Sequence, residues 1–361
     1  MTPDFWLGKR VFLTGHTGFK GTWLSLWLQQ LGAEVTGFAL PSSTNPSVFN
    51  LTNAKTGMTS ITGDVRNFAA LSNALPESHA EVVIHMAAQP LVLESYKNPV
   101  ETYSTNVMGT VNLLEAVRDC PTVRAFVNVT TDKCYENKEW LWSYRENEAL
   151  GGYDPYSSSK ACSELITSSY RNSFFNSNDF PKHLVALASA RAGNVIGGGD
   201  WSKDRLIPDI IAALSNGQPA IIRNPQAIRP WQHVLEPLNG YLTLAEKLFS
   251  SGATYAEAWN FGPSLEDAKP VSWIAEKITS IWGNGASWIS QNLDQPHEAS
   301  YLTLDTSKAK ARLCWRPHLN LEQALNLVVH WHKSLLNENN MREVTLTQIK
   351  NYQSLISCEK E

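Results

Sequence analysis

Hydrophobic positions in the first half of the chain alternate between short continuous runs and longer periodic stretches. The continuous runs have the length of single strands, and they lie at 10–15, 33–40, 81–88 and 125–131. Such runs are typical of strands that are buried on both faces of a parallel sheet. The stretches between them repeat apolar residues at helical spacing, most clearly at 19–31, 100–120 and 155–175. This alternation predicts a parallel α/β fold with helices on both faces of the sheet.

The second half of the chain is less regular. Short strands are expected at 220–223, 258–262 and 301–305, and helices at 235–249, 271–283 and 321–336. The polar stretch from Asn337 onward is expected to be peripheral. We therefore predict a Rossmann-type, doubly wound parallel sheet in residues 1–190 and a smaller C-terminal α/β substrate lobe in 191–361. Some crossing of the chain between the two is expected, with the lobe roofing the strand ends where such sheets bind ligands.

Composition narrows the classes of function. The 361 residues are 43% hydrophobic, which is enough for a large core, and the net charge of −4 offers no basic surface for nucleic acid. No apolar run approaches the roughly 20 residues needed to span a bilayer. The five cysteines show no C-x-x-C spacing, so we expect no disulfide framework, no metal site and a reducing cytoplasm.

A glycine-rich segment, TGHTGFKG (14–21), joins the first predicted strand to its helix. Gly15, Gly18 and Gly21 permit a tight turn and a close backbone approach, and the helix N-terminus offers free N–H groups to a pyrophosphate. A plain turn with a helix cap is the alternative. The second strand ends in GFAL, with neither an acidic residue for a ribose hydroxyl nor a following arginine for a 2′-phosphate, which favours NAD over NADP.

Two further motifs carry candidate chemistry. Tyr156 and Lys160 are four residues apart and project from one helical face. A lysine ammonium near a phenol, and near a positively charged nicotinamide, favours the phenolate, so we expect the pKa of Tyr156 to be lowered from about 10 toward neutral, as a base for a sugar hydroxyl requires. The segment TTDKCY (130–135) follows a buried strand, and it is either a solvated turn or an acid and a base beside a substrate.

Together these strings resemble a known family. TGHTGFKG, HMAAQ, NVMGTVNLLEA, TTDKCY and YSSSK are similar to motifs of the extended short-chain dehydrogenase/reductases that act on nucleotide sugars, the NAD-dependent epimerase/dehydratase family. The resemblance covers roughly residues 8–335. The longer strings GFKGTWL, TTDKCYEN, ARAGNVIGGGDW and RPWQHV resemble the 4,6-dehydratases that act on CDP-glucose. That activity oxidises C4 with NAD⁺, eliminates water across C5 and C6, and returns the hydride to C6.

The resemblance implies a role for each polar residue of the two motifs. Tyr156 is the base for the C4 hydroxyl, with Lys160 beside it, and Thr131 hydrogen-bonds the C4 oxygen. Asp132 is the acid for the C6 hydroxyl, so it must be protonated, which burial favours. Related dTDP-sugar dehydratases carry a glutamate as C5 base where this chain has Lys133. Lys133 is then a neutral base, a charged stabiliser of the enolate, or a surface lysine.

The same resemblance implies two sets of binding residues. The cofactor set comprises Gly15, Thr17, Gly18, Phe19, Lys20, Gly21, Asp64, Val65, Ala87, Ala88, Gln89, Asn106, Thr130, Tyr156 and Lys160. The substrate set comprises Gln89, Thr131, Arg191, Asn194, Arg205, Arg229 and Tyr301. Several alternatives stay open: Asp64 as an ordinary turn residue, Asn106 as a brace of its helix, Lys20 as a solvated cation, and the arginines as surface residues.

Three functions are compatible with these motifs. The first is the CDP-glucose 4,6-dehydratase reaction, which feeds deoxysugars of surface polysaccharide such as the O-antigen of lipopolysaccharide. The second is a nucleotide-sugar 4-epimerase or reductase, which needs no elimination pair such as Asp132 and Lys133. The third is a non-catalytic NAD-binding sensor. The resemblance also implies a homodimer or a higher homo-oligomer built through the helices at 100–120 and 155–175.

Overall fold

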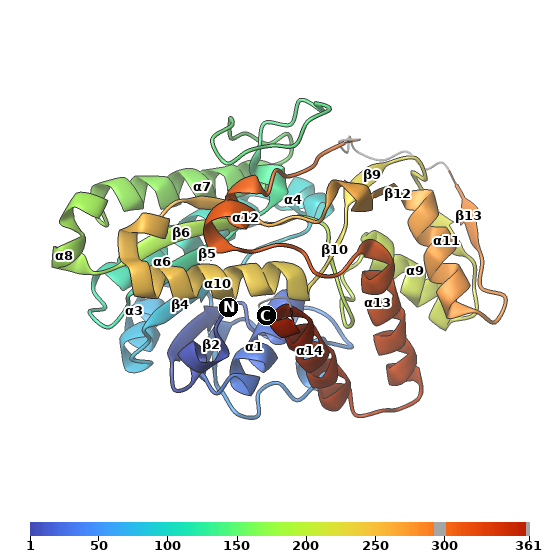
Figure 1. Ribbon diagram of the computed structural model, residues 1–361, viewed down its shortest axis with the longest axis horizontal. Helices are drawn as coiled ribbons and strands as arrows, with labels where there is room; N and C mark the ends of the chain where they lie inside the picture. Colours follow the sequence, from blue (N-terminus) through green and yellow to red (C-terminus); the bar gives the residue numbers. More distant parts are fainter. Residues whose placement is uncertain (292–300, 359–361) are drawn as a thin grey trace.

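The computed structural model describes residues 1–291 and 301–358, and its centre is a parallel sheet (Figure 1). The seven strands run in the order β11-β6-β5-β4-β1-β2-β3, and every pairing within the sheet is parallel. Their bounds are β1 Arg10–Thr14, β2 Glu34–Ala39, β3 Thr59–Thr62, β4 Val82–His85, β5 Ala125–Val129, β6 Ala186–Arg191 and β11 Ala258–Asn260. The predicted Rossmann-type sheet is confirmed.

Successive residues of each strand enter two separate cores. Val11 and Leu13 belong to one core and Phe12 to the other, as expected when side chains alternate between the faces of a sheet. One face is covered by α1 (Phe19–Gln30) and α10 (Leu235–Ser251). The other is covered by α3 (Phe68–Glu77), α6 (Gly109–Arg118) and α7 (Pro155–Ser173). Burial on both faces explains why the strands are continuously apolar.

The helix expected at 100–120 is divided into three parts. It consists of α5 (Pro99–Tyr103), a π-helical turn at Ser104–Met108, and α6. The π turn contains Asn106, whose side chain is anchored on both sides by the backbone of Gln89. A π turn is a local widening that often accompanies such a specific side-chain attachment.

Three helices of the C-terminal part form a separate core. It is built from α9 (Leu206–Ser215), α11 (Val271–Trp282) and α13 (Leu321–Leu336). Short strand pairs join them: β7 (Val195–Ile196) with β10 (Gln232–His233), β9 (Ile228–Pro230) with β12 (Ala268–Pro270), and β8 (Ala220–Ile222) with β13 (Trp288–Ser290). The prediction of a strand at 301–305 is wrong, because this segment forms an isolated bridge between Tyr144 and Leu304 and not a strand.

Segments on both sides of residue 190 build the main sheet. β11 comes after β7, β8, β9 and β10 in the sequence, yet it pairs with β6 as the edge strand of the main sheet. Helix α10 packs against β5 and β6. The division of the chain at residue 190 therefore stays a prediction. Smaller helices complete the connections: α2 (Val48–Leu51), α4 (Val92–Lys97), α8 (Phe180–His183) and α12 (Ser307–Leu313).

The expectation that the chain is peripheral beyond Asn337 is wrong. Helix α14 (Met341–Cys358) packs against α1 and α13, and it buries Met341, Ile349, Tyr352 and Ile356 at helical spacing. The hydroxyl of Tyr352 donates a hydrogen bond to Glu236 Oε2 on α10 at 2.7 Å. The few apolar residues of this polar stretch are thus enough to attach it to the core.

Candidate active site

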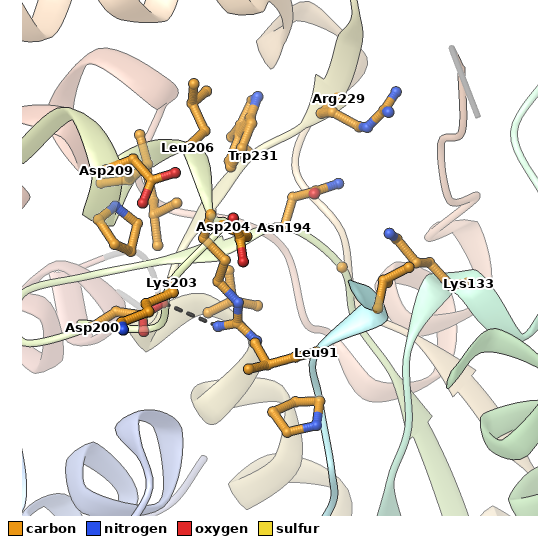
Figure 2. A pocket seen from close by; sticks show the side chains of 18 of the residues that line it. Leu91, Lys133, Asn194, Asp200, Lys203, Asp204, Leu206, Asp209, Arg229 and Trp231 are labelled. Atoms are coloured by element: carbon orange, nitrogen blue, oxygen red, sulfur yellow. Dashed lines mark hydrogen bonds and ion pairs between the residues drawn. The ribbon is translucent and has the colours of Figure 1, made fainter. Parts of the chain in front are cut away.

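A cavity of about 500 Å³ opens where β5 ends, between α1 and the C-terminal lobe (Figure 2). Its position, outside the carboxyl ends of the parallel strands, is the usual ligand site of such a sheet. The segments 192–197 and 203–209 form much of its opposite wall. The predicted site residues that line it are Phe19, Lys20, Thr130, Thr131, Asp132, Lys133, Tyr156, Asn194, Arg205 and Arg229.

The glycine-rich turn has the geometry of a phosphate cradle. Gly15 has a φ of +77°, and a Cβ there would lie 2.7 Å from the amide nitrogen of Ala87. A Cβ on Gly21 would lie 2.1 Å from the carbonyl oxygen of Gly15, whereas one on Gly18 would meet nothing closer than 3.4 Å. Gly18 caps α1 without a side-chain hydrogen bond to the first turn. The N–H groups of that turn are therefore available to a phosphate, and a dinucleotide fits here.

Three other residues of the predicted cofactor set are held by contacts within the protein. Thr17 Oγ1 donates a hydrogen bond to the carbonyl of Leu40 at 2.8 Å, just beyond β2. Val65 is buried against Gly109, where a Cβ would lie 2.7 Å from its Cγ2. Asp64 is held by Arg66 at 2.6 Å, and hydrogen bonds from Arg66 lower the pKa of this carboxyl. These residues lie outside the cavity, and so do Ala87 and Ala88; their contacts with a cofactor stay predictions.

Gln89 and Asn106 are used by the protein itself. The amide of Gln89 donates to Leu91 O and Thr102 Oγ1, and its oxygen accepts from Leu91 N at 2.6 Å. Asn106 is fully buried and donates to Gln89 O and to Ser159 Oγ. Both side chains fix the loop after β4 onto α5 and α7, which agrees with the alternative of Asn106 as a brace, and the predicted contacts of the two residues with ligands stay predictions.

Thr131 and Asp132 form a short hydrogen-bonded unit at the end of β5. Thr131 caps the 3-10 helix Asp132–Cys134, and its Oγ1 accepts from Lys133 N at 3.3 Å. The same hydroxyl donates to Asp132 Oδ1 at 3.0 Å. Asp132 is only 3% exposed, and its carboxyl group lies against Gly193. The side chain of Lys133 projects into the cavity toward Asn194 (Figure 2).

Tyr156 and Lys160 lie one turn apart on α7, whose N-cap Asp154 accepts a hydrogen bond from Ser157 N at 2.9 Å. Desolvation raises the pKa of Tyr156 to about 12, only partly offset by its hydrogen bond with Thr131 and the charge of Arg205. The expected lowering of this pKa depends on the charge of a bound nicotinamide as well, and it stays a prediction. Lys160 Nζ donates a hydrogen bond to the carbonyl of Val129 at 3.3 Å, and desolvation lowers the pKa of Lys160 itself to about 8.

A buried ion pair lies behind the strand end. Arg191 is 3% exposed and pairs with Glu164 at 2.8 Å, and it also donates to the hydroxyl of Tyr135. Arg191 is used internally and does not line the cavity, so its predicted substrate contact has no support from this arrangement and stays a prediction. Glu164 also accepts from Thr130 Oγ1 at 2.5 Å, so it ties β5 to α7. The sequence analysis missed Glu164, although its position one turn after Lys160 was visible.

The substrate side of the cavity is rich in cations. Arg205 pairs with Asp200 at 3.0 Å, and Arg229, on β9, also lines the cavity (Figure 2). Lys20 also lines the cavity; desolvation, followed by the charges of Lys160 and Arg205, lowers its pKa to about 7. Asn194 adopts a positive φ of +47° there. Lys203, a further lining cation, was missed by the sequence analysis.

Tyr301 does not line the cavity. Its carbonyl oxygen accepts a hydrogen bond from Asn137 Nδ2 at 3.1 Å. The predicted substrate contact of Tyr301 is not supported by this arrangement. Within the part of the chain that the structure describes, no three His, Cys, Asp or Glu side chains converge as they would around a metal ion. In the same ranges, no helix combines the length and the apolar character needed to cross a membrane.

The fold, and the grouping of Thr131 and Tyr156 at one cavity with Lys160 one turn after Tyr156 on α7, place the protein in the class of extended short-chain dehydrogenase/reductases. More closely, residues 12–328 match the family model described as GDP-mannose 4,6 dehydratase, and the chain belongs to that family. The family assignment and the fold predicted from the sequence are thereby confirmed.

Individual relatives support this assignment. The chain is 55% identical to CDP-glucose 4,6-dehydratase of Salmonella typhimurium, over 97% of this chain and 98% of the relative. It is 25% identical to dTDP-glucose 4,6-dehydratase of Xanthomonas campestris, over 89% and 92% of the two chains. Among solved structures, dTDP-glucose 4,6-dehydratase of Bacillus anthracis gives a TM-score of 0.74 at 21% identity, covering 93% of this chain and 100% of the other. UDP-glucose 4-epimerase of Thermotoga maritima gives 0.78 at 21% identity, covering 90% and 99%.

Proposed function

We propose that the protein catalyses the NAD⁺-dependent 4,6-dehydration of CDP-glucose to CDP-4-keto-6-deoxyglucose. The observation that carries this proposal is the pairing of Asp132 and Lys133 with Tyr156 at one cavity. A 4-epimerase or a reductase has no need of an acid and a second base beside the tyrosine. The relative from Salmonella typhimurium, at 55% identity over nearly the whole of both chains, supports both the reaction and the cytidine nucleotide.

The first step is oxidation at C4. Tyr156, as phenolate, takes the proton of the C4 hydroxyl while the C4 hydrogen leaves as hydride. The glycine-rich turn would hold NAD⁺, which would supply the hydride acceptor for this reaction and a positive charge that would favour the phenolate. Lys160 lies one turn from Tyr156 and contributes a buried positive charge to the same region. The product of this step is a ketone, which acidifies the hydrogen on C5.

The second step is elimination of water across C5 and C6. Lys133, projecting into the cavity, takes the C5 proton, and Asp132 protonates the C6 hydroxyl as it departs. Lys133 then gives its proton back to C5 as C6 is reduced. The sugar has lost one water molecule and keeps its ketone at C4, so the reaction involves no net oxidation. The overall reaction is that of a lyase.

The cations of the cavity suit a nucleoside diphosphate. Arg205 and Arg229 offer guanidinium groups that match phosphate oxygens, and Lys20 and Lys203 add charge nearby. Asn194, on the wall opposite Lys133, is a further candidate contact of the diphosphate. Three residues of the predicted substrate set have no part in this proposal, because they do not line the cavity: Gln89, Arg191 and Tyr301. The side chains of Gln89 and Arg191 bind other parts of the protein.

We also propose a homodimer and a cytoplasmic location for the protein. The dimer is supported by exposed apolar side chains on the two helical segments expected to associate, namely Val100, Tyr103, Met108 and Leu165. The cytoplasm is supported by free thiols at Cys120, Cys134, Cys162 and Cys314. The 4-keto-6-deoxy product is a precursor of the deoxysugars of surface polysaccharides such as the O-antigen.

One assay tests the proposed function. Purified protein is supplied with NAD⁺ and, in separate reactions, with CDP-, dTDP-, GDP- and UDP-glucose, and the alkaline absorbance of 4-keto-6-deoxy sugar is recorded. We expect the signal with CDP-glucose in preference to the other three. A signal with another nucleotide alone would overturn the cytidine assignment. A dehydratase should produce the keto sugar and no 4-epimer of the substrate, whereas an epimerase should produce the 4-epimer and no keto sugar.

A further inference from the structure

The segment Thr130–Tyr135 has little internal structure to hold it in place. It carries Asp132 and Lys133, yet its regular structure is a single 3-10 turn, Asp132–Cys134. The two backbone hydrogen bonds across this turn both have a donor–acceptor distance of 3.4 Å, which is long. A 3-10 turn of this length also has poorer hydrogen-bond geometry than an α-helix. The positions of the proposed acid and base therefore depend on contacts outside the segment.

One buried ion pair holds both ends of this segment. Glu164 accepts a hydrogen bond from Oγ1 of Thr130, the first residue of the segment. Arg191 donates a hydrogen bond at 2.7 Å to the hydroxyl of Tyr135, the last residue. Glu164 and Arg191 pair with each other at 2.8 Å, and both are buried. The two ends of the segment are thus joined through a single charged contact.

Each member of the ion pair also belongs to an element that forms the site. Glu164 lies on α7 eight residues after Tyr156, and therefore on the same face of that helix. Arg191 is the last residue of β6, two residues before Gly193, against which the carboxyl group of Asp132 lies. The ion pair therefore connects the helix of the oxidising base to the strand end that adjoins the acid.

Stability alone gives little reason for a buried ion pair. Removing two charges from water costs about as much as their attraction returns, and well-packed apolar residues are often equally stable in such places. An ion pair does add directional hydrogen bonds, here with Thr130, Ser189 and Tyr135. These bonds join α7, the segment and β6 at one point, so they favour a role in fixing geometry.

We propose that Glu164 and Arg191 are positioning residues that hold Asp132 and Lys133 in place for the elimination of water. The proposal rests on the proposed function. Tyr156 stands on α7 itself, so oxidation at C4 depends less on the segment than elimination does. Release of either end of the segment should therefore slow elimination selectively, and the oxidised sugar should then accumulate together with reduced cofactor.

Two substitutions release one end of the segment each while both charges stay paired. Tyr135→Phe removes the hydroxyl that binds Arg191, and Thr130→Val removes the hydroxyl that binds Glu164. Replacing a member of the ion pair would instead leave a buried charge unpaired and endanger folding. Thr130→Ser keeps the hydroxyl and is the conservative variant.

The experiment separates the two steps of the reaction. Each variant is mixed rapidly with NAD⁺ and CDP-glucose, the absorbance of reduced cofactor is followed, and keto sugar is measured in the steady state. We expect Tyr135→Phe and Thr130→Val to lower kcat for keto sugar by roughly 100-fold, the usual effect of misplacing a reacting group by about 1 Å. KM for CDP-glucose should stay close to the wild-type value, and reduced cofactor should accumulate. Thr130→Ser should behave like the wild-type protein.

Further measurements control for other roles of these residues. NAD⁺ binding to Thr130→Val should be unchanged, which separates positioning from the predicted contact of Thr130 with the cofactor. Tyr170→Phe and Thr279→Val are the matched controls. The hydroxyl of Tyr170 donates to Glu115, and that of Thr279 donates to a carbonyl of its own helix. Both controls should keep wild-type kcat, and thermal unfolding records the stability of every variant.

Two results would overturn the positioning role while the proposed function stands. The first is a wild-type kcat for keto sugar in Tyr135→Phe and Thr130→Val, whatever their melting temperatures. The second is an equal loss of oxidation and dehydration without accumulation of reduced cofactor, as a general loss of folded enzyme would give. The proposed function is judged separately, because it fails when the wild-type protein gives no keto sugar from CDP-glucose.

Discussion

The carboxyl group of Asp132 occupies the space that a side chain at residue 193 would need. An ideal Cβ on Gly193 would lie 1.9 Å from Asp132 Oδ2 and 2.0 Å from its Cγ, distances that real atoms do not reach. The glycine lies just after β6, and the aspartate just after β5, so two adjacent strand ends are fitted to each other. The position of the proposed acid is therefore fixed by the absence of a side chain on the neighbouring strand.

This fit predicts the effect of Gly193→Ala. The new methyl group should displace Asp132 and lower the rate of dehydration by roughly 100-fold or more, the usual contribution of a general acid. Gly262→Ala is the matched control, since its Cβ would meet nothing closer than 3.3 Å. Equal activities of the two variants would show that Asp132 is not held in this way.

Lys133→Ala tests the base at C5. Oxidation at C4 should continue, because it depends on Tyr156, whereas dehydration should fall by roughly 100-fold. The measurement is product formation from CDP-glucose, together with deuterium incorporation at C5 in heavy water. Exchange at C5 should be lost in this variant. If exchange at C5 persists at the wild-type rate, another group must be the base. Lys133 would then act as a charged stabiliser of the enolate. Tyr156→Phe, which stops oxidation itself, is the contrasting variant.

The three glycines of the turn should differ in what they control. Gly15→Ala and Gly21→Ala force a Cβ into backbone atoms 2.7 Å and 2.1 Å away, so both should reduce stability by about 1–3 kcal/mol, the usual cost of overpacking. Gly18→Ala has room in the protein, and its effect should be weaker binding of NAD⁺ with an unchanged melting temperature. Thermal unfolding and NAD⁺ titration separate the two results. If Gly18→Ala lowered the melting temperature and left NAD⁺ binding unchanged, the interpretation of this turn as a phosphate cradle would be contradicted.

Glu236 gives the protein a pH-dependent stability. Burial raises the pKa of this carboxyl from 4.5 to about 7, despite hydrogen bonds from Tyr352, Leu319 and His318. Because the folded pKa lies above the unfolded value, the stability that the protonated carboxyl contributes is fully present below pH 4.5 and is lost as the pH rises through 7.

Glu236→Gln keeps the shape but does not ionise. The variant should therefore become more stable than the wild-type protein as the pH rises, by up to about 3 kcal/mol above pH 7. Denaturant unfolding of both proteins at a series of pH values measures this difference. Glu322→Gln, on an exposed part of α13, controls for loss of one charge. A difference that does not change with pH would show that Glu236 is ionised throughout.

Much of the fold could be predicted because its strands are buried on both faces. Their apolar runs are continuous, and the helices between them carry clear stripes. Helix α14 could not be predicted in the same way, since its buried residues are few and stand among polar ones. The strand expected at 301–305 has the right composition, but its partner Tyr144 comes from a distant loop and pairs at one position only.

The site was predictable where function depends on residue type and spacing. Tyr156, Lys160 and the segment Thr131–Lys133 converge as expected. The predicted ligand contacts of Arg191 and Gln89 lack support from the structure for a common reason: a polar residue at a strand end can bind other parts of the protein as well as a ligand. Which partner it takes depends on residues far along the sequence, such as Glu164 for Arg191. Gly193 was missed because its function lies in the space it leaves free.

The edge strand β11 has a consequence for how the protein is made. It completes the nucleotide-binding sheet, yet it is synthesised after most of the segments that form the opposite wall of the cavity. While residues 1–190 emerge from the ribosome, β6 has no neighbour on one side, and the sheet face later covered by α10 stays open to water. We therefore expect the main sheet to remain incomplete during synthesis until about residue 260 has been translated.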